Sequence, residues 1–137
     1  MSFKYKRTFD VLVSIPSYRE FNYLFKTLES IDKQNKSILK NTLVSVVVNN
    51  SIDDNDKVIE NNHKTLEKLI HKKYQFKLCV VDAFSKGFAL NTNEAGVGIA
   101  RKISVDSMLR YTKPETVIAF LDADTLIDEH YLDIVTT

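Results

Sequence analysis

Four short apolar runs alternate along the chain with segments of helical periodicity. The runs occupy residues 9–15, 43–48, 76–81 and 116–121 and are rich in β-branched side chains. They are too continuously apolar for burial on one face only, so they predict central strands that are covered on both faces. Apolar residues recur every three to four positions in 21–31 and 58–70, and 96–111 carries a broader apolar surface, which predicts three intervening helices.

Strands that alternate with helices are typical of an α/β fold with a mostly parallel sheet and helices on both faces. The chain contains no repeat, low-complexity segment or linker, so we expect residues 1–137 to form a single domain. Ligands of parallel sheets bind where the strands end. The four segments that follow the strands, called exits here, are therefore the places to look for function.

Composition and charge exclude several classes of protein. With 44% hydrophobic and 27% charged residues, the 137-residue chain has the composition of a soluble globular domain. Its 19 basic and 18 acidic residues leave a net charge of +1, so no nucleic acid or anionic membrane is predicted as a partner. No apolar run approaches the roughly 20 residues of a membrane-spanning helix, and no signal sequence is evident, so we expect a cytoplasmic location without a membrane segment.

The only cysteine, Cys79, excludes an intrachain disulfide. It lies within an apolar run, where we expect a small buried hydrophobic side chain.

The first exit contains Pro16, Ser17, Tyr18 and Glu20. Proline is expected to end the strand and Ser17 to cap the following helix. A turn with a cap explains this segment on its own. A functional interpretation is that the Tyr18 ring stacks on a planar base while Glu20 accepts a hydrogen bond from a hydroxyl group.

The second exit, residues 49–56, is polar at seven of its eight positions. Asn, Asp and Ser in a turn that leads into a helix explain much of this run. Adjacent amides directly after a buried strand, at Asn49 and Asn50, also suit the recognition of a base or a ribose.

The third exit, residues 82–98, is long for a compact domain, and long loops are more often functional than idle. Gly96 and Gly98 would allow the backbone to approach a ligand closely, and Arg101 and Lys102 would bring positive charge to a diphosphate. A dinucleotide fingerprint is excluded, because Arg101 stands where its third glycine would be and the motif does not follow the first strand.

The fourth exit delivers Asp122 and Asp124 at the end of an apolar strand. Residues two apart in a strand project to the same side, with Cα atoms about 6.5–7 Å apart. Two carboxylates this close repel each other unless a cation or hydrogen-bond donors compensate. Magnesium bound through one or two carboxylates and substrate phosphates would do so, although a solvated turn is the simpler alternative.

Taken in order, the segments VSIPSYRE, VVVNNSIDD, GVGIARK and FLDADT resemble the nucleotide-binding half of a GT-A-fold glycosyltransferase, most closely the family 2 group. The resemblance covers nearly all of the chain, from Val11 to about Tyr131. It implies a Rossmann-like sheet that binds a nucleoside diphosphate sugar, either a UDP-sugar or a GDP-sugar.

The resemblance also implies roles for individual residues. Asp122 and Asp124 match the DxD motif, with Asp122 near the ribose and the metal and Asp124 as a ligand of Mn²⁺ or Mg²⁺. Asp53 matches an acid that structures the second exit. The implied contacts of the nucleotide sugar are Pro16, Tyr18, Glu20, Asn49, Ser51, Arg101 and Asp122.

The implied activity is metal-dependent sugar transfer to an acceptor hydroxyl, with inversion in the typical family member. The catalytic base and the acceptor site of this family normally lie well downstream of the DxD motif, so no catalytic residue is nominated here. We expect the chain to be the N-terminal, donor-binding portion of a longer enzyme whose acceptor is unknown.

Three alternatives compete with this interpretation. A non-catalytic sugar-nucleotide-binding module would carry the same exits. A nucleotidyltransferase would require a Gly-rich basic loop after the first strand, which Pro16 to Glu20 does not provide. A haloacid dehalogenase-like phosphatase would place its DxD motif near the start of the chain, followed by later catalytic groups.

Overall fold

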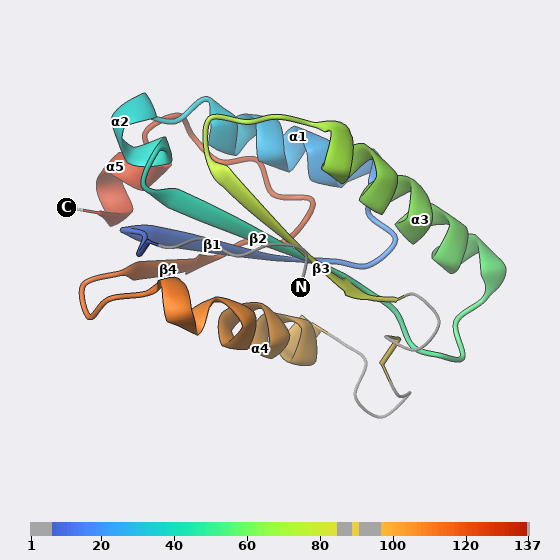
Figure 1. Ribbon diagram of the computed structural model, residues 1–137. Coiled ribbons are helices and arrows are strands. Elements are labelled where there is room, and N and C mark those ends of the chain that lie inside the picture. The colour runs from blue at the N-terminus through green and yellow to red at the C-terminus, as the bar shows by residue number, and fades with distance from the viewer. Residues whose placement is uncertain (1–6, 85–88, 91–96, 137) are drawn as a thin grey trace.

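The computed structural model describes residues 7–84, 89–90 and 97–136. It contains one parallel sheet of four strands in the order β3-β2-β1-β4, which confirms the predicted α/β class (Figure 1). The four predicted strands are present, with ends shifted by a few residues: β1 (Val11–Ser17), β2 (Thr42–Asn49), β3 (Lys77–Ala83) and β4 (Val117–Phe120).

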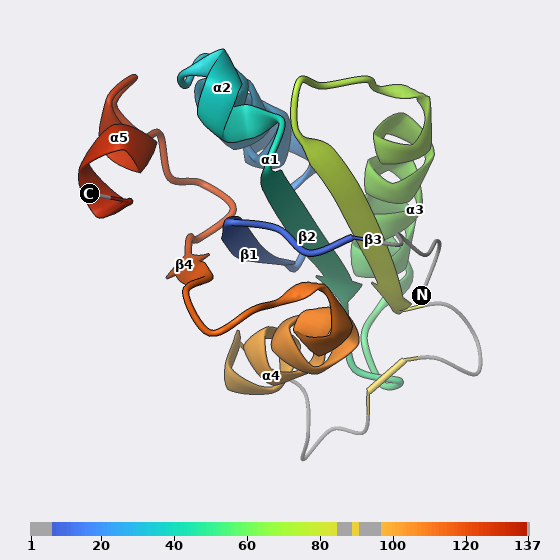
Figure 2. The same ribbon diagram turned by 60° about the vertical axis from the view of Figure 1, so that its left-hand side comes forward.

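Helices cover both faces of the sheet. In Figures 1 and 2, α4 lies on one face, and α1 and α3 lie on the opposite face. None of the helices in the described ranges combines the length and apolar composition needed to cross a membrane. The helices are α1 (Phe21–Asp32), α2 (Lys36–Leu39), α3 (Asp56–His71), α4 (Val97–Met108), the 3-10 turn η1 (Leu109–Tyr111) and α5 (Tyr131–Val135).

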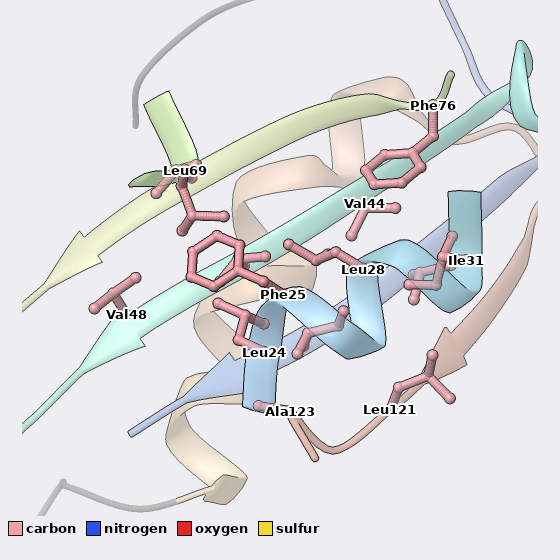
Figure 3. Close-up of a cluster of buried hydrophobic side chains, with 14 of the residues drawn as sticks. Leu24, Phe25, Leu28, Ile31, Val44, Val48, Leu69, Phe76, Leu121 and Ala123 are labelled. Atoms are coloured by element: carbon pink, nitrogen blue, oxygen red, sulfur yellow. The ribbon is translucent and has the colours of Figure 1, made fainter. Parts of the chain in front are cut away.

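Alternate residues of the central strands feed two separate hydrophobic cores. Val13 and Val44 face the core that α1 and α3 cover, whereas Leu12 and Leu43 face the core that α4 covers. Figure 3 shows α1 side chains, Leu28 among them, packed over the strands in the first of these cores. Burial on both faces is the reason that β1 and β2 are continuously apolar in sequence.

The prediction that all four strands are covered on both faces is wrong for β4. This strand lies at the edge of the described sheet, next to β1, and alternates between buried and exposed residues. Ala119 is buried, whereas Ile118 and Phe120 are 37% and 47% exposed. Four residues are too few to distinguish an apolar edge strand from a central one by composition.

Pro16 does not end the first strand, contrary to the prediction. It lies inside β1 and pairs in register with Val47 of β2. The pairing of β1 with β4 ends at Ser14 and Phe120. Leu121 N donates to Ser14 O, so even-numbered residues of β1 direct their backbone toward β4. Proline is tolerated because its missing N–H would point to the side where β4 has already diverged.

Candidate functional site

The exits of the parallel strands meet at one edge of the sheet, and specific contacts join them in pairs. Tyr18 in the first exit bonds to Asp54 in the second, and Arg101 on α4 pairs with Asp122 in the fourth. The predicted contact residues therefore lie at the carboxyl ends of the strands. They lie at or after the ends of β1, β2 and β4 or belong to α4.

Ser17 does not cap α1, contrary to the prediction. It is the last residue of β1, fully buried, and its Oγ has no hydrogen-bond partner in the described part of the chain. The N-cap position is Glu20, whose side chain makes no capping bond. Instead, the amide of Asn61 on α3 accepts a hydrogen bond from Phe21 N, at 3.2 Å. The first helix is thus capped from a neighbouring helix.

The neighbouring amide, Asn62, holds the turn that precedes this cap. Its Oδ1 accepts from Arg19 N at 3.2 Å. Arg19 has φ 54°, the left-handed region that residues other than glycine seldom occupy. A backbone of this kind persists where the surroundings hold it, and such positions cluster at functional sites. The strained turn lies directly between Tyr18 and Glu20, the two predicted ligand contacts of the first exit.

Asn49, the predicted base contact, is 3% exposed and uses its amide nitrogen within the protein. Nδ2 donates to Ser17 O at 3.2 Å and to Val47 O at 3.3 Å. These bonds fix the amide plane, and no described residue donates to the amide oxygen, which is an acceptor. Asn49 also ties the second exit to the first.

Asp54 organises the second exit. It accepts from Ser51 N at 2.7 Å through one carboxylate oxygen and from Tyr18 Oη at 2.8 Å through the other. Burial raises the pKa of Tyr18, and the hydrogen bond to Asp54 raises it further. The ring of Tyr18 is still 44% exposed, so stacking on a base is compatible with its bond to Asp54. The resemblance pointed to Asp53 for this loop-structuring role, whereas these two bonds are made by Asp54.

The second exit is also joined to the third. Ser51 and Leu90 form a parallel bridge, with Leu90 N donating to Asn50 O at 3.0 Å and Ile52 N donating to Leu90 O at 2.8 Å. Most of the long third exit, including Gly96, lies outside the described residues, whereas Gly98 belongs to the first turn of α4.

The fourth exit forms a turn in which Thr125 N donates to Asp122 O at 3.1 Å. Ala123 points into the fold and is 4% exposed, while Asp122 and Asp124 on either side of it are exposed, in agreement with the period of two that the sequence predicts for these aspartates. The buried hydroxyl of Thr27 on α1 donates to Ala123 O at 2.9 Å. A hydrogen bond from the helix thus fixes the turn between the two carboxylates.

Charges of both signs meet at this turn. Arg101 Nη2 lies 3.1 Å from Asp122 Oδ1, and the Nε of the same guanidinium is buried without a hydrogen-bond partner among the described residues. Burial raises the pKa of Glu20, and the negative charges of Asp124 and then Asp122 raise it further. Lys102 points elsewhere, pairing with Asp106 one turn along α4. Of these two basic side chains, Arg101 is therefore the one that contacts the turn.

The two carboxylates of this turn are the candidate ligands of a metal ion. Within the described ranges, no group of three or more His, Cys, Asp or Glu side chains is arranged to hold a metal ion. A third carboxyl group, Glu20, lies close enough that burial and then the charges of Asp124 and Asp122 raise its pKa. Magnesium with a nucleotide needs only one or two protein carboxylates because phosphate oxygens and water complete its shell. The two aspartates fit such an ion together with a diphosphate, but do not form a closed protein cage.

Sequence reasoning missed Asn61 and Asn62, which act on the first two exits from the middle of α3. A signal was present: asparagine is a poor helix former, and two in succession inside a 16-residue helix need another explanation. It also missed two polar side chains, Ser30 on α1 and Gln34 just after that helix, that bond to the segment after the turn. Ser30 Oγ accepts from Ile127 N, and Gln34 bonds to Asp128 O and Leu132 N.

Comparisons with known proteins give matches among solved structures only. No family model matches the chain, and none of the curated proteins matches it. The crystal structure of S. aureus TarS 1-349 superposes with a TM-score of 0.60 at 23% identity, covering 91% of this chain and 30% of that one. The same TarS region in complex with UDP-GlcNAc gives a TM-score of 0.58 at 22% identity, covering 91% and 29%. Its complex with UDP gives 0.58 at 22%, covering 91% and 30%.

The chain thus spans less than a third of the TarS structures that it matches. At this level of identity the likeness establishes architecture. The expected fold is confirmed: the chain has the α/β fold of the N-terminal region of TarS, a GT-A glycosyltransferase.

Proposed function

We propose that this chain binds the nucleoside diphosphate sugar of a sugar-transfer reaction, with a UDP-sugar as the donor. The observation that carries the proposal is the placement of Arg101, Asp122 and Asp124 at the same sheet edge as the amide-lined exits of β1 and β2. UDP and UDP-GlcNAc are bound by TarS, whose fold this chain shares, which favours uridine over guanosine.

The nucleoside would lie against the first two exits. The exposed ring of Tyr18 offers a stacking surface, and the fixed oxygen of Asn49 accepts from an N–H on the edge of a base. Glu20 would accept from a ribose hydroxyl. Pro16 and Ser51 would contribute to the backbone walls of this pocket.

The diphosphate would lie against the turn of the fourth exit. The buried Nε of Arg101 has no hydrogen-bond partner in the part of the chain that the structure describes, and its ion-pair partner Asp122 is exposed. The guanidinium can therefore shift its hydrogen bonds to phosphate oxygens. Asp124, with Asp122, would hold Mn²⁺ or Mg²⁺. Such an ion stabilises negative charge on a departing diphosphate.

We further propose that residues 1–137 act as one donor-binding domain within a glycosyltransferase of the inverting, family 2-like kind. No residue of this chain is assigned as the catalytic base or as an acceptor contact. Sugar transfer is tested with the full-length protein. Donor binding without sugar transfer and without donor hydrolysis would identify a binding module.

The metal and diphosphate assignment is tested by calorimetry with UDP and with UMP, each with and without Mn²⁺. Asp124→Ala should lower the affinity for UDP in Mn²⁺ by at least about tenfold. Loss of a residue that only hydrogen-bonds to a metal ligand already lowers metal affinity by roughly that factor. The affinity for UMP should change little. Asp106→Ala is the matched control, because it removes an exposed acid from α4 away from the turn.

Binding of UDP that needs no metal and is unchanged in Asp124→Ala would overturn the metal assignment. Parallel titrations with GDP test the base, since a preference for GDP over UDP would contradict the uridine donor.

A further inference from the structure

Asn62, in the middle of α3, makes its hydrogen bonds to the first and second exits. Its side chain is 0% exposed. Nδ2 donates to Asn49 O at 3.0 Å and to Asn50 Oδ1 at 3.1 Å, while Oδ1 accepts from Arg19 N at 3.2 Å. One amide thus contacts two separate segments. Arg19 lies between the predicted contacts Tyr18 and Glu20, and Asn49 and Asn50 directly precede the predicted contact Ser51.

The chemistry of this position suits an amide. Two bonds need a donor and the third needs an acceptor, and a primary amide supplies both from one planar group. A carboxylate would lack the donor. An apolar side chain would leave two buried acceptors and the partly buried N–H of Arg19 without this partner. Because asparagine does not favour a helix interior, the contacts to the exits explain its presence better than helix formation does.

The bond to Arg19 has a further consequence for the first exit. The left-handed backbone at Arg19 turns the chain between Tyr18 and Glu20, and Asn62 accepts the N–H of that residue. Loss of the acceptor would allow the turn to relax toward ordinary backbone angles. Tyr18 and Glu20 would then change position relative to Asn49.

We propose that Asn62 is a positioning residue that sets the spacing of the first and second exits, and so the shape of the nucleoside end of the donor site. This inference rests on the proposed function. Arg101, Asp122 and Asp124 make none of its hydrogen bonds. Loss of the Asn62 amide should therefore weaken binding of the nucleoside part of the ligand, whether or not a metal and a second phosphate are present.

Calorimetry with UMP and with UDP, each with and without Mn²⁺, tests this division. Asn62→Ala should lower the affinity for UMP and UDP by a similar factor of roughly tenfold, equivalent to about 1.4 kcal/mol, in both conditions. Asp124→Ala should affect only UDP with Mn²⁺.

A control variant separates positioning from general loss of stability. Thr65→Val alters a fully buried residue one turn further along α3, whose hydroxyl donates to Asn61 O within the helix and to no other described residue. It should keep affinity for UMP within about twofold of the parent, well below the tenfold change that 1.4 kcal/mol represents. An equal loss in Thr65→Val, or none in a folded Asn62→Ala, would overturn the proposal.

Asn62→Asp gives a second test if the alanine variant does not fold. A carboxylate here faces two acceptors, whereas the protonated acid regains one donor and the shape of the amide. The ratio of its UMP affinity to that of the parent should rise as the pH falls from about 8 to about 5.5, because burial raises the pKa of a carboxyl group. A ratio that does not depend on pH contradicts the positioning role.

Ligand binding by the parent protein separates failure of the proposed function from failure of the positioning role. If it binds neither UMP nor UDP under any condition, the proposed function fails. If it binds both and the Asn62 variants bind equally well, only the positioning role fails.

Discussion

Two parts of the site are built in different ways. The amide network, consisting of Asn49, Asn50 and Asn62, is at most 3% exposed, and its members hydrogen-bond to one another and to backbone groups. The charged end, consisting of Glu20, Arg101, Asp122 and Asp124, is open to solvent: the side chains of Arg101 and Asp122 are 39% and 61% exposed. One part is fixed before any ligand arrives, whereas the other holds charges whose partners can change.

The difference follows from the surroundings of each group. Buried polar groups lose water, so an unmade hydrogen bond costs much more than a made one contributes. Exposed ions retain their water, and their pairs contribute only about 0–1 kcal/mol. In the proposed donor site, the rigid amide network would select the nucleoside by shape, and the adaptable charged end would neutralise the phosphates.

The largest expected effect is on the amide network. Asn62→Leu should lower the free energy of unfolding by about 2–4 kcal/mol, because it removes the donor from two buried acceptors, Asn49 O and Asn50 Oδ1, and the acceptor from the partly buried Arg19 N. Urea unfolding followed by circular dichroism measures this change. The same measurement on Asp122→Asn, at the charged end, should differ from the parent by less than about 0.5 kcal/mol. Equal losses at both positions would show that the two parts do not differ.

A smaller effect is expected from the ion pair at the charged end. A double-mutant cycle with Arg101→Gln and Asp122→Asn should give a coupling energy below about 1 kcal/mol, as for other exposed pairs. Because surface charges are screened by ions, the coupling should shrink further in high salt. A coupling of several kcal/mol that persists in salt would show that this pair is as firmly fixed as the amide network.

The smallest effect is the pH dependence that Glu20 contributes. Its pKa is raised above the ordinary value of 4.5 by burial and by the charges of Asp124 and Asp122. The folded state therefore binds the proton more tightly than the unfolded state, so stability should fall as pH rises from 4.5 through the raised pKa. Thermal melting of the parent and of Glu20→Gln across this range should show a decline that the variant lacks. Saturating UDP with Mn²⁺ should reduce the decline.

The strands and the order of the exits could be predicted from the sequence because both are local patterns. Continuous apolar runs identify β1 and β2, and polar residues follow each run directly. The alternation around Ala123 was also predictable, since side-chain direction in an extended chain has a period of two. The position of β4 at the edge was not, because neighbours in a sheet are set by tertiary pairing.

The supports of the site escaped prediction for the same reason. Asn61 and Asn62 act on residues about forty positions earlier in the chain, and Thr27 acts on a residue almost a hundred positions later. No spacing rule in the sequence connects such partners. Only the poor helix propensity of the two asparagines marked them, and propensity alone does not identify what a side chain contacts.

The central place of β1 determines when the sheet can be completed during synthesis on the ribosome. β2 and β3 follow β1 in sequence, so one side of β1 can pair early. Its other side pairs with β4, and the bond from Thr116 Oγ1 to Phe9 O spans 107 positions. Chain ends this far apart meet slowly because the entropy of loop closure opposes them. A nascent chain therefore carries an open, apolar strand edge until β4 emerges, and chaperones that shield such edges should engage it in that interval.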